Sequence, residues 1–550
     1  MEVFVIGILC TLNSFCLSKS EALRIAANQY PRAFPLYGLL KCTHSSRSLS
    51  AESLAKSMKS KTLAPVAPIR IRSLSHWPIN PTGDFVLYWM TAFRRTRFNF
   101  SLQRAVELSN QLNKPLVVLE AIRCNGRWMC DRFHRFLLDG MLDNATVIQK
   151  SKATYCGYVE SRSNEAKGLV ETFASHACVV VSDDFPCFFH PALYQKIASN
   201  WRCAFELVDS NTIVPMRTAE KTFTVAHSYR RYMQKEIYKC MPDFPIENPL
   251  AELRCPRLAA LPAEITTKWQ VWENQVASRE LKKVSLDSIA IDHSVPACSE
   301  KGGPVEAGNV LTRFVDQRLA DYGEARNEPE KQGSSWLSPY LHFGHISPHE
   351  VFQRIATATN WTPEKLDKPN GKMTGFWNMG GDAEAFMDQL MSWREIGFNM
   401  CWRERNYNRF ESLPGWAQKT LDDHASDVRP IVYELPQLEA AQTHDSLWNA
   451  AQVQLVREGR IHNYLRMLWG KKILQWTTSP REALHIMIEL NNKYALDGRD
   501  PNSYSGIFWV LGRYDRAWGP ERPIFGKIRY MTSESTQSKY RVKQYIKTYS

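Results

Sequence analysis

The sequence predicts a protein of two parts: an α/β domain built on a parallel, Rossmann-like sheet, followed by an all-α domain. Its 550 residues exceed what one ordinary hydrophobic core can hold. Short apolar runs alternate with helical patterns from about residue 75 to residue 215. Beyond about residue 310, nearly every periodic segment repeats with the period of a helix. The alternation indicates the sheet domain, and the later pattern indicates the helical domain.

The α/β domain is predicted to span residues 75–215. Its apolar, strand-like runs are 85–89, 115–119, 157–159, 178–181 and 205–208. Helical patterns occupy the segments between them, at 102–112, 131–149, 166–175 and 192–199. Strands that alternate with helices in this way form a parallel sheet that is covered on both faces.

A connector and the helical domain follow. The pattern weakens across 216–310, where prolines and charges are frequent, which is typical of a long connector with some helix. The helical domain is predicted to span 311–550, with helices at 385–402, 446–457, 462–476 and 481–492. Gly459 is the predicted C-cap between the second and third of these helices. No repeat of fixed period is present, which excludes a helical repeat array.

Residues 1–70 are predicted to form a disordered leader. The chain starts with an apolar run that lacks the basic residues and the small-residue cleavage site of a signal peptide. Residues 18–62 are rich in Ser, Ala and Lys. No other segment has the ~18 uninterrupted apolar residues that span a bilayer. We therefore expect a cytoplasmic, DNA-associated protein without membrane contact, and the role of the leader stays open.

Charge and residue content narrow the classes of partner. The net charge of +13, with a pI near 9.1, indicates a surface that attracts polyanions such as nucleic acid. The 13 cysteines include no C-x-x-C pair, which excludes a zinc ribbon and an iron-sulfur cluster, so no metal site is expected. The 17 Trp and 21 Tyr concentrate in the C-terminal half beside arginines. That pattern serves either stacking on bases or packing in a core.

Residues 491–509 form the densest unusual stretch of the chain. A predicted helix ends there, and a turn rich in Asp, Asn and Gly follows, after which Asn502 or Ser503 can cap the next helix. Capping accounts for one or two of these polar residues, but not for so many together. The stretch is therefore a candidate functional site.

Two further segments combine arginine with tryptophan. In 512–522, guanidinium groups suit phosphates and an exposed Trp suits a base. An interhelical corner held by Asp515 and its neighbouring arginines is the simpler alternative there. In 466–476, Trp469 and Trp476 stand seven residues apart on one helix face, and periodicity alone favours core packing for them.

Residues 332–344 place a Gly and three Ser hydroxyls around the start of a helix that contains Pro339 in its first turn. Backbone N–H groups at such a start suit a phosphate, and capping by Ser338 explains the pattern equally well. No dinucleotide fingerprint, Walker A sequence, Ser-His-Asp signature or H-E-x-x-H accompanies it. The segment is therefore not a standard nucleotide site.

In this order along the chain, these segments resemble the photolyase and cryptochrome superfamily, and specifically its class II photolyases. The matching strings are WLSPYLHFGHIS, THDSLWNAAQ, GRIHNYLRMLWGKKILQW, NNKYALDGRDPNSYSGIFW and RAWGPERPIFGKIRYM. The resemblance is continuous from about 314 to 549 and dilute from 83 to 211. It implies an antenna domain, a connector and a helical domain that holds a bent FAD. The implied enzyme is a lyase that uses light and reduced FADH⁻ to split cyclobutane pyrimidine dimers in DNA.

The resemblance also implies roles for individual residues. The residues that line the FAD phosphates and ribityl chain would be Tyr322, Ser335, Leu337 and Ser338. Arg466 and Asp497 would pair beside the isoalloxazine, and Asn491 would face its N5 atom. An electron-transfer chain from the surface to the flavin would consist of Trp448, Trp469 and Trp476. The dimer would be flipped out of the duplex, a mode of access of which photolyases are a known example. The residues that contact the lesion or the phosphates would be Arg326, Trp393, Met467, Trp509, Arg516, Trp518 and Arg529.

Three positions depart from the family pattern. Gln389, within FMDQLMSW, stands where class II enzymes commonly carry a Glu that hydrogen-bonds the lesion. Trp336 replaces a small residue of the phosphate-binding turn. Residues 91–99 replace an acidic R-x-D-x-R-x-x-D-N sequence, so whether an antenna chromophore binds, and which one, stays open.

Two other functions are weighed against repair. A cryptochrome-like photoreceptor would bind FAD and signal, but it has no need of the surface formed by Trp509, Arg516, Trp518 and Arg529. A DNA-binding module without flavin leaves Asn491 and Asp497 unexplained. We therefore expect a monomeric enzyme whose partner is damaged DNA.

Overall fold

The computed structural model describes residues 65–550. Residues 1–64, most of the predicted leader, lie outside the described residues. The rest of that predicted leader belongs to the fold, because Val66 and Arg70 are buried. The guanidinium of Arg70 donates to the carbonyl oxygen of Ile213 at 2.8 Å and pairs with Asp243 at 2.7 Å. Residues 65–70 are therefore part of the packed structure, contrary to the prediction for these positions.

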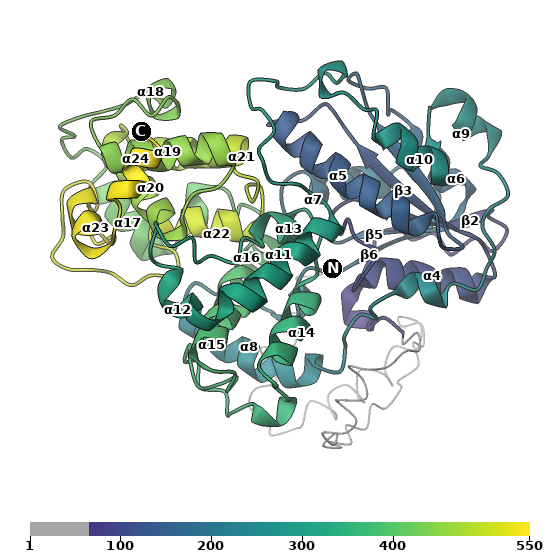
Figure 1. Cartoon of the computed structure of the whole chain (residues 1–550), viewed down its shortest axis with the longest axis horizontal. Coiled ribbons are helices and arrows are strands. Elements are labelled where there is room, and N and C mark those ends of the chain that lie inside the picture. The colour runs from purple at the N-terminus through teal and green to yellow at the C-terminus, as the bar shows by residue number, and fades with distance from the viewer. Residues whose placement is uncertain (1–64) are drawn as a thin grey trace, which may run out of the picture. The chain divides into compact units, whose positions relative to one another are not determined.

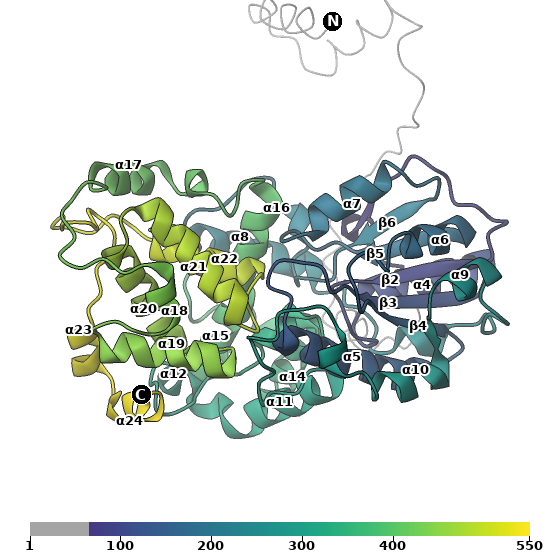
Figure 2. The same ribbon diagram turned by 90° about the horizontal axis from the view of Figure 1, so that it is seen from above.

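A seven-stranded sheet forms the centre of the α/β part (Figures 1 and 2). Its strand order is β1-β6-β5-β2-β3-β4-β7. The inner strands run parallel and match the predicted runs; they are β2 (Phe85–Met90), β3 (Leu116–Ile122), β4 (Thr154–Val159), β5 (Ala177–Asp183) and β6 (Phe205–Val208). At the edges, β1 (Ile71–Ser73) and β7 (Trp272–Glu273) pair antiparallel. The predicted α/β fold with a parallel sheet is confirmed, and each edge adds an antiparallel strand.

Helices cover both faces of this sheet, as the alternating pattern predicted. On one face, α4 (Phe100–Leu112) and α5 (Asp131–Ile148) share a core with Val86 and Tyr88 of β2. On the other face, α6 (Leu169–His176) and α7 (His190–Ala198) share a core with Phe85 and Leu87. Successive side chains of a strand point to opposite faces, and every residue of β2 is buried. A continuous apolar run is therefore what a strand at this position requires.

The predicted connector contributes to both parts, because its first helix packs into the helical core and its later residues join the sheet. It contains α8 (Ala226–Cys240), α9 (Ala263–Lys268) and α10 (Asn274–Leu281). Between the last two helices the chain returns to the sheet, where Trp272 pairs with Gly157 and Glu273 pairs with Cys156. Helix α10 then packs beside α5 (Figure 1). A domain boundary at residue 215 leaves out this edge strand and this helix.

Residues 311–550 are helical, and no strand is assigned among them. The helices of this part and its entrance are α11 (Pro304–Gln317), α12 (Tyr322–Ala325), α13 (Ser338–His342), α14 (Pro348–Ala358), α15 (Gly381–Met387), the π-helix η7 (Asp388–Trp393), α16 (Arg394–Arg403), α17 (Gly415–Asp423), α18 (Leu435–Glu439), α19 (Ser446–Glu458), α20 (Asn463–Trp476), α21 (Pro480–Tyr494), α22 (Pro501–Val510), α23 (Ser533–Lys539) and α24 (Lys543–Thr548). Helices α19, α20 and α21 confirm three predicted helices. The predicted helix 385–402 is interrupted by the π-helix.

The observed helix caps match the caps predicted from the sequence at one position and differ from them at two. Gly459 ends α19 with a left-handed φ of 67°, as predicted. The cap of α22 is Asp500, whose carboxylate accepts from the N–H of Asn502 at 2.8 Å, so the prediction of Asn502 or Ser503 is wrong. Ser338 is the first residue of α13 and makes no cap hydrogen bond. Its hydroxyl is therefore available to another partner.

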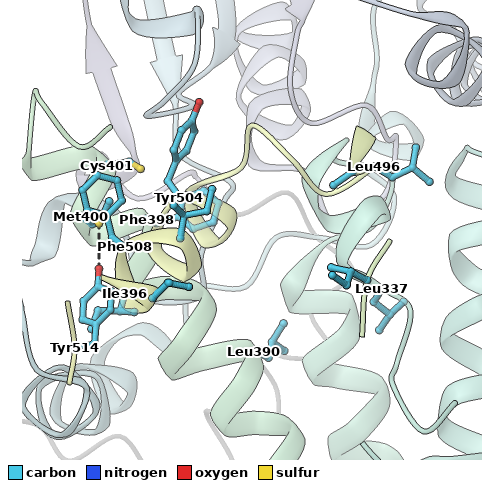
Figure 3. Packing of buried hydrophobic residues seen from close by; sticks show 14 of the residues in the cluster. Leu337, Leu390, Ile396, Phe398, Met400, Cys401, Leu496, Tyr504, Phe508 and Tyr514 are labelled. Carbon is cyan, nitrogen blue, oxygen red and sulfur yellow. Dashed lines mark hydrogen bonds between the residues drawn. The ribbon is translucent and has the colours of Figure 1, made fainter. Parts of the chain in front are cut away.

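One large core joins the helices of the second part (Figure 3). Helices α16 and α22 pack closely because Gly397 faces the start of α22, where a Cβ atom would lie 2.6 Å from the carbonyl oxygen of Pro501. Phe398, Met400 and Phe508 belong to this core. The result is a rigid pair of helices, and their ends carry the predicted lesion contacts.

Glu395 ties α16 to the segment that follows the sheet. It accepts a hydrogen bond from the N–H of Ile213 at 2.7 Å, and its other oxygen has no partner among the described residues. Burial raises the pKa of Glu395 to about 8, against the opposing effects of that hydrogen bond and of the charge on Arg394. The side chain is therefore a neutral carboxylic acid at neutral pH.

We expect this buried acid to make stability fall as pH rises. The folded state keeps a proton that the unfolded chain releases above a pKa near 4.5. The contribution of this protonated carboxyl group to the free energy of unfolding is therefore complete below pH 4.5, and it is lost as the pH rises toward 8. Urea titrations at about pH 6 and pH 8 measure this effect. Between these pH values, the free energy of unfolding of wild type should fall by about 2–3 kcal/mol more than that of Glu395→Gln. Glu411→Gln, at a mostly exposed position, is the matched control. Parallel curves for wild type and Glu395→Gln would contradict this account.

Candidate functional site

A π-helix carries two of the predicted lesion contacts. It spans Asp388–Trp393, and Gln389 and Trp393 are both half-buried on it. The Trp393 ring stacks on the ring of Trp509 from α22, with centroids 4.5 Å apart and planes 18° apart. π-helical turns are frequent at functional sites. The fold thus brings together two predicted residues that lie far apart in sequence, and they form a flat apolar surface.

A buried ion pair fixes the start of this π-helix. Asp388 receives two hydrogen bonds from the guanidinium of Arg230 on α8, at 2.6 and 3.1 Å. Arg230 also donates to the carbonyl oxygen of Gly371 at 3.2 Å. Removing one partner of such a pair leaves an uncompensated buried charge, at a cost of about 3–5 kcal/mol. The pair therefore holds the π-helix against α8.

Arg466 and Asp497 pair as the resemblance implies, at 3.0 Å. Burial alone would raise the pKa of Asp497, but the charge of Arg466 and hydrogen bonds from Arg466 and the hydroxyl of Ser338 lower it below its ordinary value. The carboxylate therefore stays ionised. Arg466 Nε is buried without a hydrogen-bond partner among the described residues. A buried donor of this kind suits an acceptor on a bound molecule, such as a flavin beside this pair.

Asn491 is fixed in a single orientation near the end of α21. It is buried, and its Nδ2 atom donates to Ser503 Oγ at 2.6 Å. No group among the described residues donates to its Oδ1 atom. The amide therefore presents a free carbonyl oxygen, which suits an N–H donor such as flavin N5-H.

The segment before α13 has an excess of hydrogen-bond donors and positive charge. Arg318 and Arg460 lie over the Trp336 ring, at 4.7 and 4.3 Å from its centroid. Burial, and then the charges of Arg313 and Arg460, lower the pKa of Arg318, and Arg318 forms no ion pair among the described residues. Its guanidinium donates to the carbonyl oxygen of Ser334 at 3.1 Å. A positive group without a counter-ion beside a polar turn suits a phosphate.

The predicted phosphate-binding residues surround this turn. Tyr322 and Leu337 are buried, and Ser335 Oγ accepts from the N–H of Leu337 at 3.4 Å. Trp336 adopts a left-handed backbone with a φ of 62°, which is rare for a large side chain. The departure at position 336 therefore adds an arginine-stacking platform to the turn.

The three predicted electron-transfer tryptophans lie together. The rings of Trp448 and Trp476 have centroids 5.6 Å apart, and Trp448 Nε1 donates to the carbonyl oxygen of Trp469 at 3.0 Å. Their exposed fractions are 0%, 2% and 3% for Trp448, Trp469 and Trp476. All three are thus interior side chains, whereas the resemblance implies a chain that starts at the surface.

The arginine-rich loop after α22 has the features of a phosphate-binding surface. Arg516 and Arg529 lie 4.7 and 5.3 Å from the centroid of the half-buried Trp518. Asp515 accepts from Trp518 Nε1 at 3.1 Å and forms no ion pair among the described residues. Asp515 also accepts from the backbone N–H of Arg516 at 2.9 Å, so this carboxylate holds the corner through hydrogen bonds and not through salt bridges. Among the other predicted contacts, Arg326 and Met467 are half-buried, and Arg326 Nε has no partner in the described part of the chain.

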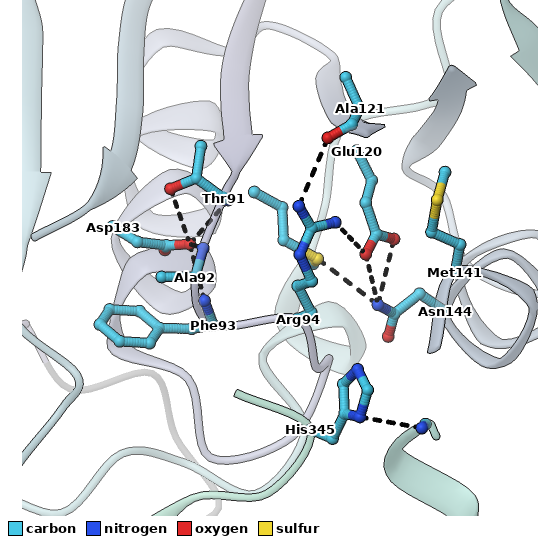
Figure 4. A network of polar contacts seen from close by, with 12 residues as sticks. Thr91, Ala92, Phe93, Arg94, Glu120, Ala121, Met141, Asn144, Asp183 and His345 are labelled. Carbon is cyan, nitrogen blue, oxygen red and sulfur yellow. Dashed lines mark hydrogen bonds and ion pairs between the residues drawn. The ribbon is translucent and has the colours of Figure 1, made fainter. Parts of the chain in front are cut away.

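The strand order reverses beside β2, where doubly wound sheets bind their ligands (Figure 4). Here one oxygen of Asp183 accepts from the N–H groups of Thr91, Ala92 and Phe93, at 2.9, 2.7 and 2.8 Å. Arg94 pairs with the buried Glu120 at 3.0 Å. The charged groups of this crevice thus satisfy one another.

Several contributors to the site carry no signal that sequence reasoning found. They are Arg230, Asp388, Arg318 and Arg460. Arg230 and Asp388, for example, bond each other across 158 residues of sequence. Among these residues, only an arginine stacked on Trp336 could have been predicted from the sequence, because aromatic rings often bind cations. The described residues contain no group of three or more His, Cys, Asp or Glu side chains that could hold a metal ion. No helix in the described range is both long enough and apolar enough to cross a membrane.

Comparison with known proteins identifies the relatives. The deoxyribodipyrimidine photo-lyase of Methanothermobacter thermautotrophicus is 32% identical over 478 residues, which cover 87% of this chain and 97% of that protein. That of Arabidopsis thaliana is 33% identical, covering 88% and 92%. The chain belongs to the deoxyribodipyrimidine photo-lyase family. It is therefore a lyase of DNA photorepair, and FAD is the cofactor of its family.

More distant matches agree with the photolyase fold. A class III photolyase from Agrobacterium tumefaciens has a TM-score of 0.59 at 16% identity, covering 85% of this chain and 86% of that one. A cryptochrome from Synechocystis has a TM-score of 0.58 at 13% identity, covering 84% and 88%. No family model matches the chain. The structural matches show the photolyase and cryptochrome fold, and the sequence relatives show the photolyase family.

Proposed function

We propose that this protein is a class II photolyase that splits cyclobutane pyrimidine dimers in DNA with an electron from reduced FAD. The stacked pair of Trp393 and Trp509 carries this proposal, because a flat apolar surface suits an extruded pyrimidine dimer. The loop with Arg516, Trp518 and Arg529 supplies cations without counter-ions, which suit the DNA backbone. A light sensor without DNA needs neither feature.

The flavin, when bound, supplies light absorption and the electron, and the protein supplies its position. Arg466 and Asp497 would lie beside the ring system, with Arg466 Nε donating to a flavin acceptor. The free Oδ1 of Asn491 would accept from N5-H, which favours a reduced flavin. Arg318 and the turn that contains Ser335 and Leu337 would hold the phosphates.

On the DNA side, the protein holds the dimer and excludes water. The rings of Trp393 and Trp509 would contact the dimer, and their stacking excludes water from one side. Gln389 would donate its amide N–H to a thymine carbonyl, and it cannot deliver a proton. Electrostatic stabilisation of the lesion radical anion therefore rests on neutral hydrogen bonds.

An illuminated repair assay tests the proposal. Oligonucleotides with a defined cyclobutane dimer, or with a 6-4 photoproduct, are incubated with protein whose flavin has been reduced beforehand. We expect intact thymines only from the cyclobutane substrate and only in light. A yellow protein that reduces its flavin in light but repairs neither lesion would instead be a photoreceptor. We also expect a monomer in the cytoplasm, which gel filtration and cell fractionation would test.

Gln389→Glu is expected to raise the quantum yield of repair while leaving lesion affinity within about threefold of wild type. A carboxyl group can donate a stronger hydrogen bond to the lesion radical anion than an amide can. Gln389→Met, which keeps the size and removes the hydrogen bond, should lower the yield. The measurement is repair per absorbed photon at saturating substrate. An unchanged yield in Gln389→Glu would show that this position does not act on the lesion.

A further inference from the structure

A second buried amide lies directly beside Asn491. Asn492 follows it near the end of α21, and their exposed fractions are 2% for Asn491 and 1% for Asn492. Asn491 Nδ2 donates to Asn492 Oδ1 at 3.4 Å and to Ser503 Oγ at 2.6 Å. An amide can rotate by half a turn about its last bond, which exchanges the places of its oxygen and its nitrogen. These two contacts therefore bear on which end of Asn491 stays free.

The Ser503 contact holds the amide without choosing its orientation. A hydroxyl group can both donate and accept a hydrogen bond. Ser503 can therefore pair with the nitrogen of Asn491, as observed, or with its oxygen after half a turn. The choice between the two orientations must come from Asn492.

The backbone fixes the orientation of Asn492. Its Oδ1 atom accepts from the backbone N–H of Arg499 at 2.8 Å, and its Nδ2 atom donates to the hydroxyl oxygen of Tyr504 at 3.2 Å. A backbone N–H can only donate, so it requires the oxygen of Asn492 at this place. That oxygen can only accept, so it requires the nitrogen of Asn491. After half a turn of Asn491, two carbonyl oxygens would face each other with no proton between them.

Arg499 is in turn held by several contacts. Its guanidinium carbon lies 3.5 Å from the centroid of the Phe133 ring on α5. The guanidinium donates to the carbonyl oxygens of Asn492 and Ala495. Arg499 is buried, and its backbone is left-handed with a φ of 62°. The N–H group that orients Asn492 is therefore placed by packing between the two parts of the protein.

We propose that Asn492 is a positioning residue: its backbone-fixed carbonyl oxygen keeps the carbonyl oxygen of Asn491 directed at flavin N5. The inference rests on the proposed function, in which Asn491 accepts from N5-H. In the opposite orientation, the amide protons of Asn491 would face the N5 proton, and no hydrogen bond would form. Reduced flavin carries this proton and oxidised flavin does not. Loss of the orientation therefore disfavours the reduced form.

The reduction potential of bound FAD tests this role. It is measured in the dark on FAD-loaded protein against a reference dye. Asn491→Leu should lower the ratio of reduced to oxidised flavin at a fixed potential about tenfold, which is ~30 mV for two electrons. Asn492→Leu should lower the same ratio severalfold, because the Asn491 amide then populates both orientations.

Asn399→Leu is the matched control for this measurement. Asn399 is also buried, its Oδ1 atom accepts from the backbone N–H of Phe223 at 2.9 Å, and its Nδ2 atom donates to the carbonyl oxygen of Lys221 at 3.0 Å. The variant removes a similar pair of hydrogen bonds from another helix, α16. Its flavin potential should equal that of wild type.

Infrared difference spectra between oxidised and reduced flavin give a second readout. The carbonyl stretch of Asn491, identified by its loss in Asn491→Leu, should shift to lower frequency on reduction in wild type, because this oxygen then accepts from N5-H. Asn492→Leu should weaken the shift. Asn492→Asp keeps an acceptor oxygen at the same place and should keep the shift, so it tests the inference even where the leucine variant takes up no FAD.

The outcomes separate the inference from the proposed function. An unchanged potential in Asn491→Leu would mean that Asn491 does not meet N5, which overturns that placement and the inference with it. A lowered potential in Asn491→Leu, combined with a wild-type potential in Asn492→Leu, would overturn the role of Asn492 alone. Loss of the carbonyl shift in Asn492→Asp would also overturn that role.

Discussion

Replacing Trp509 with alanine is expected to weaken binding of dimer-containing DNA by about 10- to 100-fold, since stacking of a base on an aromatic ring is worth ~1–3 kcal/mol. The loss should be specific for the lesion, because the phosphate contacts are left in place. Affinity for undamaged DNA, and the dependence of that affinity on salt, should therefore stay as in wild type. Fluorescence anisotropy with matched damaged and undamaged duplexes measures both quantities.

The stacked geometry supplies a sharper test of the same site. Trp393→Ala should cost a similar amount, and the double variant should lose less than the sum of the two, because each ring is the other's stacking partner at 4.5 Å. Trp272→Ala, at a half-buried tryptophan on the edge strand β7, is the matched control. Equal losses for damaged and undamaged duplexes would mean that the tryptophan pair does not read the lesion.

Trp448→Phe is expected to abolish light-driven reduction of bound flavin while leaving repair by chemically reduced flavin intact. Trp448 is in contact with Trp476 and hydrogen-bonds the backbone of Trp469, so it is the middle member of the cluster. Phenylalanine keeps the packing largely in place but is much harder to oxidise than tryptophan. The rate of flavin bleaching under blue light with an external reductant measures the effect.

A second buried tryptophan provides the control for that experiment. Trp361 also donates its indole N–H to the backbone of another tryptophan, Trp377, at 2.5 Å, and it is likewise buried. Trp361→Phe removes the same hydrogen bond and similar packing outside the proposed chain. If both variants lose photoreduction equally, the effect comes from general damage to the fold and not from electron transfer.

Segments with strong local patterns were predicted correctly. The five inner strands and helices α19, α20 and α21 lie where the apolar period placed them. When a helix or strand is buried on one or two faces, its apolar residues recur at a regular spacing in the sequence. Such elements can therefore be predicted without knowledge of the tertiary structure. The π-helix at Asp388–Trp393 was missed because one widened turn changes the period too little to be seen in six residues.

Other errors arose where partners distant in sequence decide the structure. Arg70 was assigned to the leader that the Ser-, Ala- and Lys-rich stretch predicts, yet its acceptors lie beyond residue 208. The edge strand β7 is two residues long and exists because β4 offers it hydrogen bonds. Asp500 caps α22, a role for which Asn502 and Ser503 are equally suitable by residue type. Local propensity cannot choose among such candidates.

The sequence by itself determined the two-part α/β and helical architecture, the basic character and, through its ordered motifs, the resemblance to photolyases. Hydrophobic period and motif order are properties of the linear chain, so they can be read without coordinates. Only the tertiary structure decided that Trp393 stacks on Trp509, that Arg466 Nε is left without a protein partner, and that Trp448 lies against Trp476. These features depend on distances between side chains from different helices, and packing of the whole core sets those distances.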